Sequence, residues 1–470
     1  TLCDGQYLQP PHSGGESREE NLNPVFRLAL PDCSFFLRRM GAWERWSSGV
    51  GFILAAIGSA VGIGNIWRFS SVLGENGGGA YLVPYLLAVL CFAVPLMVLE
   101  MSVGRHLRAD VVSSFGRAGR SFKAFGWLIC LILLLILSYY LVITGWTLAY
   151  LAFSLLGIDV AFSDFTSSLQ PVAYFLISAL ATGAIVSSGV KKGIERLVSV
   201  LVPFAFLILL ALALFCLTLP GAQAGMSFLF RPDYSMLLQP GLWSAAIGQA
   251  FFSLSVGMGI LITYGAYLDD DADIPKSALI VTVSDLLAAI LAGVAIFSLV
   301  FTFGLPPTAG AELAFITLPR AFELISYGPI LSVAFFALLF SAALTSAVSM
   351  LEVNVAAVMG QTGMSRRKAS LLLTMALIAL GLPSALSYSS IDLSFFGSRI
   401  LDLLDETVGT LGLPIAAFLV AMVFRWFMDE HLLHSQLGVL NGWMRSLPFL
   451  TKYAIPTVLI IITILSLMEQ

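Results

Sequence analysis

Two apolar stretches of the sequence are interrupted in the same way: residues 58–67 read GSAVGIGNIW, and residues 253–260 read SLSVGMGI. Both contain Val-Gly-x-Gly, at Val61–Gly64 and at Val256–Gly259. Glycine costs a helix about 1 kcal/mol relative to alanine, so a matched pair of such interruptions needs a reason. Close packing of helices would explain one of them. Two, with one in each half of the chain, favour a pair of broken membrane helices that expose backbone groups to a ligand.

The composition of the whole chain is that of a membrane protein. Of 470 residues, 58% are hydrophobic and only 11% are charged, whereas soluble domains carry about a quarter charged residues. No charge occurs between Lys123 and Asp159 or between Arg196 and Arg231, and about 20 apolar residues suffice to cross a bilayer as a helix. A soluble enzyme, a disordered chain and a nucleic-acid-binding protein are therefore excluded.

The apolar segments predict an all-α integral membrane protein with eleven spanning helices. These are expected near residues 48–71, 80–103, 124–152, 171–188, 194–218, 241–267, 276–303, 329–359, 368–385, 398–424 and 452–468. Residues 305–325 are too polar to cross the bilayer and predict an extramembrane hairpin. Residues 1–40 mix Pro, Gly, Ser and acidic residues and predict a disordered tail, with Met40 as a candidate start.

The distribution of Lys and Arg predicts how the chain is oriented. Cytoplasmic loops of membrane proteins carry an excess of these residues. All of them except Arg68, Arg231, Arg320 and Arg399 fall on the same side as the amino terminus. We therefore expect a cytoplasmic amino terminus and, with an odd number of spans, an external carboxyl terminus. The chain has no Asn-x-Ser/Thr acceptor and no large second outer loop, which favours a prokaryotic inner membrane.

Polar residues lie close to both interruptions, and their chemistry predicts a cation site. Asn65 follows the first Gly-x-Gly, while Gln249, Ser253 and Ser255 surround the second. Later helices add Ser284, Asp285, Thr345 and Ser346. Oxygen ligands without thiols or imidazoles suit an alkali or alkaline-earth cation. A lone hydroxyl in a membrane helix usually bonds to its own backbone, so Thr345 and Ser346 alone are weak indications.

Acidic residues at or near membrane depth are further candidates, because they are costly there and usually functional. The sequence has four of them, Glu100, Asp285, Glu352 and Asp405. Glu352 lies near a helix end, as does Asp402, and both could simply be solvated there. No enzyme is indicated, since the His431–His434 pair has no carboxylate at a spacing suited to metal catalysis.

GSAVGIGNIWRF at 58–69, followed by ENGGGAYLVPY at 75–85, resembles the neurotransmitter:sodium symporter family. The resemblance covers nearly everything from residue 43 onward and is greatest to the bacterial branch that carries amino acids. It implies a sodium-coupled symporter that imports an amino acid by alternating access, in a transporter domain over 41–470. Two inverted five-helix repeats, 46–220 and 240–425, would precede an extra helix at 450–470. A non-transporting amino-acid sensor on the same scaffold and a channel are the alternatives.

The resemblance also implies two sodium sites. The first would use the Ala60 carbonyl, the side chains of Asn65, Ser253 and Ser284, and the carboxylate of the substrate. The second would use the carbonyls of Gly58, Val61 and Ala342 with the hydroxyls of Thr345 and Ser346. A carboxylate shared with a sodium ion makes the affinities for substrate and ion depend on each other.

The implied substrate site lies between the two interruptions. Its residues would be Ala60, Gly62, Gly64, Ile136, Tyr140, Phe252, Ser253, Ser255, Met258, Ser346 and Met350. Tyr140 would bind the carboxylate of the substrate. Family members that carry amines have an acid at the position of Gly62, so glycine implies a substrate with its own carboxylate. The apolar lining favours a hydrophobic or aromatic amino acid such as tryptophan, tyrosine, phenylalanine or leucine.

Two gates are implied by the same resemblance. Arg68 and Asp405 would pair across the outer side, above Phe252. The arginine and aspartate that usually close the inner side are replaced by Trp43 and Gly360 in this chain. Arg45 with Asp269, Asp270 or Asp271 is a candidate replacement, although a solvated charge cluster is the simpler interpretation.

The resemblance also allows a prediction of whether transport requires chloride. Tyr85, Gln249, Ser253 and Ser284 match the chloride-site positions of animal members. Chloride-independent relatives can carry a carboxylate at the position of Ala288, and Asp285 is near enough on the helix to supply that charge or to carry a proton. We therefore expect transport without chloride and with proton counter-movement. No obligate protein partner is indicated.

Overall fold

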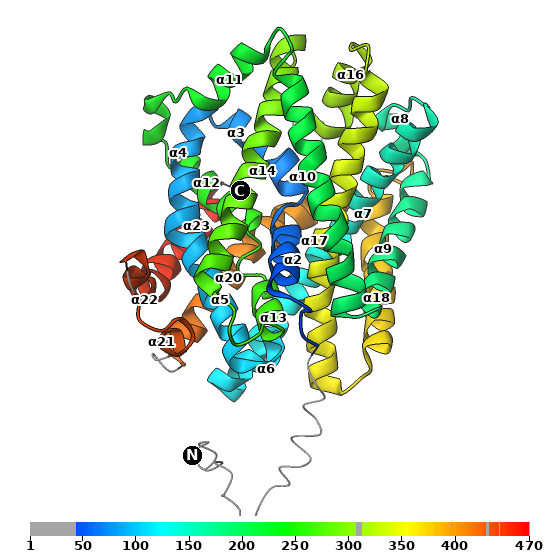
Figure 1. The fold of residues 1–470 in the computed structure, drawn as a ribbon. Coiled ribbons are helices and arrows are strands. Elements are labelled where there is room, and N and C mark those ends of the chain that lie inside the picture. Colours follow the sequence, from blue (N-terminus) through cyan, green and yellow to red (C-terminus); the bar gives the residue numbers. More distant parts are fainter. Residues whose placement is uncertain (1–43, 307–312, 396, 429–431, 441, 470) are drawn as a thin grey trace, which may run out of the picture. The chain divides into compact units, whose positions relative to one another are not determined.

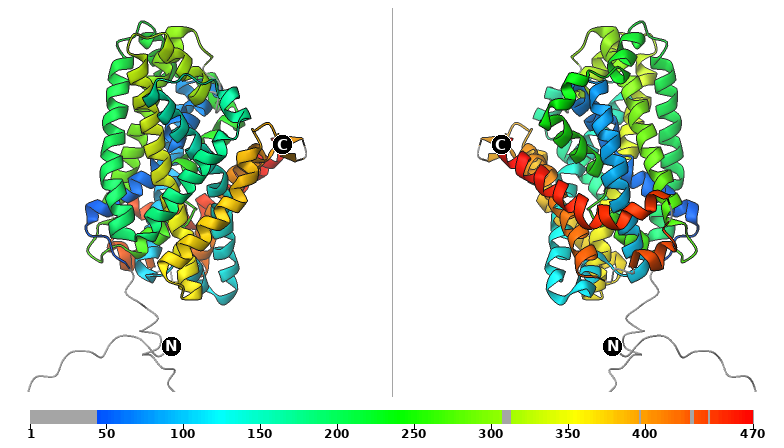
Figure 2. Two further views of the ribbon diagram at one scale, coloured as in Figure 1. Left: turned by 90° about the vertical axis from the view of Figure 1, so that its right-hand side faces the viewer. Right: turned by 90° about the vertical axis from the view of Figure 1, so that its left-hand side faces the viewer.

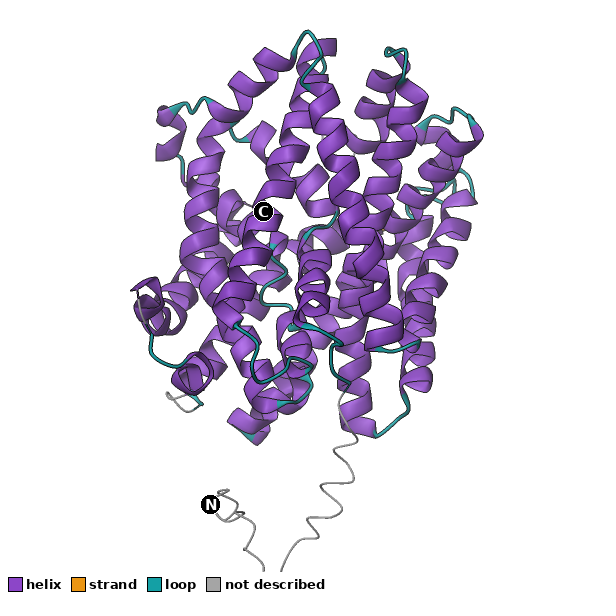
Figure 3. Ribbon diagram, viewed as in Figure 1, coloured by secondary structure: helices purple, strands orange, loops and turns teal. Residues whose placement is uncertain are grey.

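A computed structural model of the chain describes residues 44–306, 313–395, 397–428, 432–440 and 442–469 (Figure 1). The predicted tail, Trp43 and His431 lie outside these residues. Nearly all of the described chain is helical, and Figure 3 shows helices joined by short loops. The prediction of an all-α membrane protein is confirmed, whereas the division into two inverted repeats stays a prediction.

The α-helices and strands follow one another with short 3-10 or π-helical segments, labelled η, between them. The first half contains α2 (Gly49–Ala60), η2 (Gly64–Arg68), α3 (Phe69–Glu75), α4 (Gly79–Ala88), η3 (Val89–Ala93), α5 (Val94–Leu107), α6 (Val111–Ala118), η4 (Arg120–Phe122), α7 (Lys123–Leu156), α8 (Phe162–Ser167), α9 (Gln170–Ser187), η5 (Val190–Glu195), α10 (Arg196–Cys216), α11 (Ala222–Phe230) and η6 (Tyr234–Leu238). The second half contains α12 (Pro240–Ser253), α13 (Ile260–Ala266), α14 (Ile274–Phe303), η7 (Leu313–Thr317), α16 (Leu318–Glu323), α17 (Gly328–Thr362), α18 (Arg366–Leu386), β1 (Ser394–Phe395), β2 (Ser398–Arg399), α19 (Ile400–Leu404), η8 (Asp405–Gly412), α20 (Leu413–Trp426), α21 (Leu432–Leu437), η9 (Gly442–Ser446), α22 (Leu447–Phe449), η10 (Leu450–Ala454) and α23 (Ile455–Glu469).

Ten of the eleven predicted spanning segments are found in the described residues, when a bent pair of helices is counted as one span. Within the described residues, 9 helical segments are long and apolar enough to cross a membrane, and the bent pair formed by α2 with η2 and α3 makes a tenth. The remaining predicted segment, 241–267, is divided into α12 and α13 by residues 254–259, which are not helical. Helix α2 packs against α17 and α10 (Figure 1), and α23 packs against α20 at one side (Figure 2).

The first predicted break is present between α2 and η2. Helix α2 begins after Ser48, whose hydroxyl accepts a hydrogen bond from Gly51 N at 3.0 Å, as an N-cap should. It ends at Ala60, because Val61 turns to extended backbone with φ −76° and ψ 94°. The segment Gly64–Glu75 then leaves at 52° to α2. The Val-Gly-x-Gly motif therefore interrupts the helix where the sequence predicts it.

The second break follows Ser253 and has a more unusual backbone. Ser255, Gly257 and Gly259 all have positive φ, at 53°, 84° and 74°. Glycine adopts such angles without cost, whereas other residues are strained there. A Cβ atom on Gly257 would lie 2.5 Å from Ala417 Cβ, which is too close for carbon atoms. Both the backbone angle and the neighbouring helix α20 thus require glycine at this position.

We expect Gly257→Ala to destabilise the protein by about 1–3 kcal/mol or more. Alanine is strained at this φ, and its Cβ atom also collides with Ala417. Thermal unfolding of the purified, detergent-solubilised protein measures the change. Gly248→Ala is the matched control: Gly248 lies inside α12 with no atom within 4 Å of its added Cβ. There alanine should be neutral or stabilise by up to about 1 kcal/mol. A Gly257→Ala protein as stable as the wild type would contradict the described break.

Candidate functional site

The two breaks meet at a small central cavity. It has a volume of about 30 Å³ and is lined by Ser59, Ala60, Gly62, Gly64, Asn65, Ile136, Tyr140, Phe252, Ser253, Ser255, Met258, Ile260, Ser346 and Met350. Every residue that the resemblance implied for the substrate site is among them. Ser59 and Ile260 were not suggested, although each adjoins a residue of one of the two interruptions. A cavity of this size holds about one water molecule, so a larger ligand requires its walls to move.

The broken backbone is held together by hydrogen bonds across the cavity. The Ser255 hydroxyl donates to Ser59 O at 2.9 Å, and Gln249 Nε2 donates to Gly64 O at 3.2 Å. Each of these two hydrogen bonds joins a residue at the second break to a residue at the first. Polar groups released by the missing helical turns must find partners inside a membrane protein, and these two side chains supply them.

Asn65 is the centre of a fully buried polar cluster. Its Oδ1 accepts a hydrogen bond from Gly62 N at 3.1 Å. Its Nδ2 donates to Ser253 Oγ at 3.0 Å and to Asp285 Oδ1 at 2.6 Å. Ser253 Oγ lies 2.9 Å from both carboxylate oxygens of Asp285, and Tyr85 OH lies 3.3 Å from Ser253 Oγ. The cluster therefore joins the first break, the second break, α4 and α14.

The structure differs from the sequence prediction at residues 284 and 285. Ser284 was the predicted sodium ligand, but it is half-buried and has no hydrogen-bond partner among the described residues. The adjacent Asp285 lies in the cluster instead and is completely buried. Successive residues of an α-helix point about 100° apart, so both side chains cannot face the same site. Ala288, at whose position chloride-independent relatives can carry a carboxylate, is buried in α14.

A second group of oxygen atoms lies between α2 and α17, as the resemblance implied. The Ser346 hydroxyl lies 3.1 Å from Ala342 O, 3.3 Å from Ser59 O and 3.4 Å from Gly58 O. The Thr345 hydroxyl donates to Ala342 O at 3.0 Å. Thr345 thus bonds within its own helix, whereas Ser346 also reaches the end of α2. Val61, the remaining predicted ligand, is buried where α2 ends.

A cavity of about 530 Å³ adjoins the central one and shares Gly64, Tyr140 and Phe252 with it. We call it the outer cavity, because it contains the residues of the predicted outer gate. Arg68 and Asp405 both line it, but they form no ion pair in the described structure, in contrast to the predicted closed gate. The guanidinium of Arg68 lies over the Phe252 ring, 4.4 Å from its centroid. Asp405 Oδ1 accepts a hydrogen bond from Tyr139 OH at 2.9 Å instead. Each of the two charged groups thus has a different partner in this conformation.

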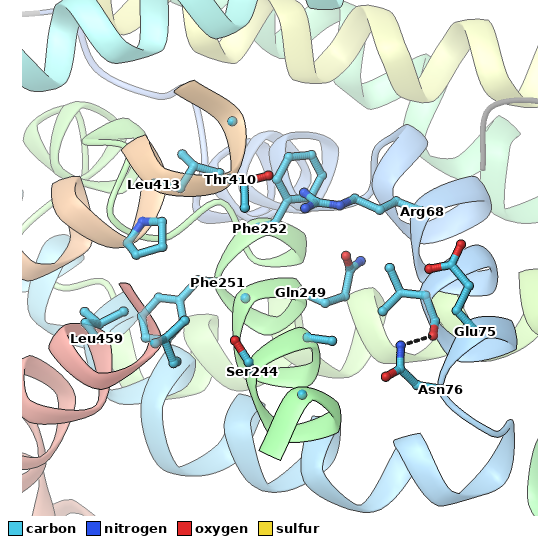
Figure 4. A pocket seen from close by; sticks show the side chains of 17 residues that line it. Arg68, Glu75, Asn76, Ser244, Gln249, Phe251, Phe252, Thr410, Leu413 and Leu459 are labelled. Atoms are coloured by element: carbon cyan, nitrogen blue, oxygen red, sulfur yellow. Dashed lines mark hydrogen bonds between the residues drawn. The ribbon is translucent and has the colours of Figure 1, made fainter. Parts of the chain in front are cut away.

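A further cavity of about 240 Å³ shares Arg68, Val72 and Phe252 with the outer cavity. Figure 4 shows Phe252 and Arg68 side by side, with Gln249 between them and Asn76. Gln249 Oε1 is buried without a hydrogen-bond partner among the described residues. Of the residues that match the chloride-site positions of animal members, Tyr85 and Ser253 contact each other, whereas Gln249 bonds to the backbone of the first break.

Glu100 supports the second break from α5. Its Oε1 accepts a hydrogen bond from Gly257 N at 2.7 Å, and its side chain is completely buried. This bond satisfies a backbone donor that the missing helical turn leaves free. The intramembrane acid predicted from hydrophobicity thus contacts the broken backbone and not the central cavity.

On the side of the predicted inner gate, Arg366 forms a network that the sequence did not indicate. Arg366 NH1 lies 2.6 Å from Glu352 Oε2, and Arg366 Nε lies 3.0 Å from Glu44 Oε1. Tyr267 OH also donates to Glu352 Oε1 at 2.7 Å. The candidate pair from the sequence, Arg45 with Asp269, is present at 3.5 Å, but its side chains are 61% and 45% exposed. Such solvent-exposed ion pairs contribute little to the stability of a protein. A buried carboxylate such as Glu352 requires a cation as its partner. This requirement is the feature of the sequence that could have pointed to Arg366.

Gly360 has a neighbour that explains the missing aspartate on α17. Asp110, the N-cap of α6, accepts hydrogen bonds from Ser113 N at 2.9 Å and from Gln361 Nε2 at 3.3 Å. Burial raises the pKa of this carboxyl. A Cβ atom on Gly360 would lie 2.2 Å from Asp110 Oδ2. The loop aspartate thus occupies the space that a side chain at position 360 would need.

Comparisons with known proteins agree with this geometry. A model of the sodium:neurotransmitter symporter family matches residues 43–169 and 155–470. The chain is 35% identical over 424 residues to an uncharacterized sodium-dependent transporter of Methanocaldococcus jannaschii, with 85% of each chain covered. It is 36% identical over 391 residues to the uncharacterized sodium-dependent transporter YhdH of Bacillus subtilis, covering 80% of this chain and 86% of that relative.

Among solved structures, the chain is similar to the crystal structure of MhsT in complex with L-phenylalanine. The TM-score is 0.84 at 40% sequence identity, and the match covers 90% of this chain and 99% of MhsT. The similarity therefore extends over most of the described chain.

We expect Glu352→Gln to lower the stability of the protein by about 1.5–3 kcal/mol, since it removes the fully buried carboxylate that lies 2.6 Å from Arg366 NH1 and leaves the guanidinium with the partly exposed Glu44 as its ion-pair partner among the described residues. Asp269→Asn, which breaks the exposed pair with Arg45, is the control and should cost at most about 1 kcal/mol. Thermal unfolding in detergent compares the two. Equal effects of both substitutions would mean that the Arg366 network does not hold the inner side closed.

Proposed function

The chain belongs to the sodium:neurotransmitter symporter family, and we propose that it uses a sodium gradient to import an amino acid by alternating access. Members of this family are sodium-coupled transporters that lie in membranes as multi-pass proteins. The observation that carries the proposal is the central cavity, where all the residues suggested for a substrate site line one space between two broken helices. The complex of L-phenylalanine with the similar MhsT supports an amino acid as the cargo.

In the proposed first sodium site, Asp285 takes the place suggested for Ser284. The site would combine Asp285 and Ser253 with the Asn65 amide, the Ala60 carbonyl and the carboxylate of the substrate. Sodium prefers such hard oxygen ligands. The hydrogen bonds that join Asn65, Ser253 and Asp285 at 2.6–3.0 Å support this assignment. A carboxylate in the protein also lowers the electrostatic cost of a buried cation.

In the proposed second site, sodium would lie between the end of α2 and α17. Its ligands would be the carbonyls of Gly58, Val61 and Ala342 and the hydroxyls of Thr345 and Ser346. The contacts of Ser346 with Gly58 O and Ala342 O support this set. The helix α2 ends at this point, and the carbonyls at its end carry partial negative charge that favours a cation. Two ions per cycle are therefore proposed.

The proposed substrate is a hydrophobic or aromatic amino acid. A Cβ atom on Gly62 would lie 2.8 Å from Ser346 Oγ and 3.4 Å from Tyr140 OH, so no acidic side chain fits at this position. The substrate would then bring its own carboxylate to the first sodium ion, in addition to that of Asp285. Ile136, Met258 and Met350 give the cavity apolar walls, and methionine adapts readily to ligands of different shape.

The proposed cycle starts from the conformation of this structure. The outer cavity of about 530 Å³ reaches Phe252, while the inner side is closed by the Arg366 network and by Trp46, whose Nε1 donates to Tyr264 O at 3.1 Å. Binding of substrate and sodium would bring Arg68 and Asp405 together above Phe252. The inner network would then open, with the amino terminus in the cytoplasm. The shared carboxylate couples substrate to ion.

We propose that transport needs no chloride. The Asp285 carboxylate contacts Ser253, and Ser253 contacts Tyr85, so a fixed negative charge lies where animal members would place the anion. The same carboxylate could return a proton in exchange, which makes proton counter-movement part of the proposal.

Asp285→Ala should weaken sodium-dependent amino-acid binding at least about tenfold, because one lost ligand in a dry site costs about 1.4 kcal/mol or more. Ser284→Ala is the matched control and should stay within about twofold of the wild type. Scintillation binding with each of the twenty amino acids, in sodium and in potassium, measures both. Loss of binding in Ser284→Ala alone would overturn the assignment, as would wild-type binding that is equal in potassium.

Uptake into proteoliposomes tests transport and the role of chloride together. With gluconate in place of chloride, sodium-driven uptake should remain within about twofold, and an acidic lumen should increase it. Uptake that falls to background in gluconate would contradict the role proposed for Asp285. Sodium-dependent binding without any flux would instead support the sensor.

A further inference from the structure

A cavity of about 790 Å³ lies outside the proposed transport path, where α14 begins. It shares no lining residue with the central or outer cavities. Its walls come from η3 and α5, from the start of α14, and from α21 and η9. Leu90, Val94, Leu279, Leu437, Trp443 and Met444 make most of them apolar. The cavity therefore suits a hydrophobic ligand many times the size of a water molecule.

One side of this cavity faces the surroundings of two spanning helices. Leu90 is 54% exposed and Leu279 is 56% exposed, and both lie on segments that are long and apolar enough to cross a membrane. Leu87 and Val283 extend the exposed apolar surface by one helical turn on each helix. In a bilayer these side chains contact acyl chains, because the hydrocarbon is the surrounding solvent. An acyl chain can thus enter the cavity from the membrane.

The polar end of the cavity carries one charge of each sign. Asp273 caps α14, and its Oδ1 accepts a hydrogen bond from Lys276 N at 3.0 Å. The Lys276 ammonium has no ion-pair partner among the described residues, and both side chains are exposed. A phosphate fits beside Lys276 at the amino-terminal end of α14, where the helix dipole favours an anion. A primary ammonium fits beside Asp273.

The surrounding charges favour a ligand that carries both groups over a purely anionic one. Residues 269–273 read DDDAD. Arg108 pairs with Asp270 and Arg45 with Asp269, whereas Asp271 and Asp273 have no ion pair in the described part of the chain. An anionic headgroup without an ammonium would therefore meet repulsion next to Lys276. A methylated amine would lack the N–H groups that a carboxylate can accept.

The cavity is built into the fold by one buried guanidinium. Arg105 is only 7% exposed. Its Nε donates to Gln436 Oε1 at 2.8 Å, its NH2 donates to Gln436 O at 2.5 Å, and its NH1 donates to Ala272 O at 2.5 Å. Gln436 and Ala272 both line the cavity. Arg105 thus fixes two walls, α21 and the start of α14, so the cavity is not simply a gap between loosely placed segments.

We propose that this cavity binds one phospholipid of the surrounding bilayer whose headgroup carries a phosphate and a primary ammonium, as in phosphatidylethanolamine. The phosphate pairs with Lys276, the ammonium pairs with Asp273, and an acyl chain fills the space between Leu90, Leu279 and Trp443. The bound lipid bridges α14 and η9, next to the Arg105 junction.

Native mass spectrometry of the full chain, taken from nanodiscs with equal phosphatidylethanolamine, phosphatidylcholine and phosphatidylglycerol, tests the proposal. The wild type should retain one phosphatidylethanolamine in preference to the other two. Asp273→Asn should reduce the preference over phosphatidylcholine about fivefold, from the loss of one charge pair near the membrane surface, while asparagine still caps the helix. Lys276→Gln should lower retention of all three lipids. Lys192→Gln, an exposed lysine on η5, is the control and should change nothing.

Three outcomes would overturn the proposal. The first is equal or better retention of phosphatidylglycerol by the wild type, which would indicate an anionic-lipid site. The second is unchanged lipid selectivity in Asp273→Asn. The third is undiminished retention in Leu279→Trp, which fills the cavity, because the lipid would then lie elsewhere. Thermal unfolding gives an independent reading: added phosphatidylethanolamine should raise the melting temperature of the wild type and not that of Leu279→Trp, whose own unfolding transition shows that this variant is folded.

Discussion

The structure depends on one constraint: inside a membrane, every backbone N–H and C=O must find a partner within the protein. Two broken helices violate this constraint unless side chains replace the lost helical bonds. Asn65 does so for Gly62 N, Glu100 for Gly257 N, and Gln249 for Gly64 O. Each of these side chains is buried. The polar residues around the breaks are therefore required by the fold before they have any role in transport.

The same constraint links the fold to the proposed chemistry. Groups that satisfy a broken backbone are oxygen-rich, buried and already positioned, which are the properties that a dehydrated sodium ion needs. Asp285 and Ser253 belong to the cluster around Asn65, and Ser346 reaches from α17 to the end of α2. An ion and a substrate carboxylate would exchange one set of partners for another. That exchange requires little rearrangement, because the surrounding helices hold the donors and acceptors in place.

The paired glycines in the sequence were sufficient to place the two breaks, because they destabilise an apolar helix and so indicate where it stops. The residues of the central cavity followed from the family resemblance and not from the glycines. The sequence was insufficient wherever helix rotation or packing between distant segments decides the outcome. Ser284 and Asp285 differ by one residue, and only the packing of α14 determines which one meets Asn65. Arg366 reaches Glu352 from the next helix, and no periodicity indicates that contact. The separation of Arg68 from Asp405 is a property of one conformation, which a sequence does not specify.

Gly360 and Asp110 illustrate how such packing restricts change in the chain. Position 360 has room only for a hydrogen atom, because a carboxylate at the start of α6 fills the adjoining volume. Introducing a side chain on α17 alone creates a collision, whereas shortening Asp110 alone leaves Gln361 and Ser113 without their shared acceptor. The effects of the two positions are therefore not additive. An acidic side chain can therefore move from the loop before α6 to position 360 on α17 only if both residues are replaced together. The identities of the two residues thus depend on each other.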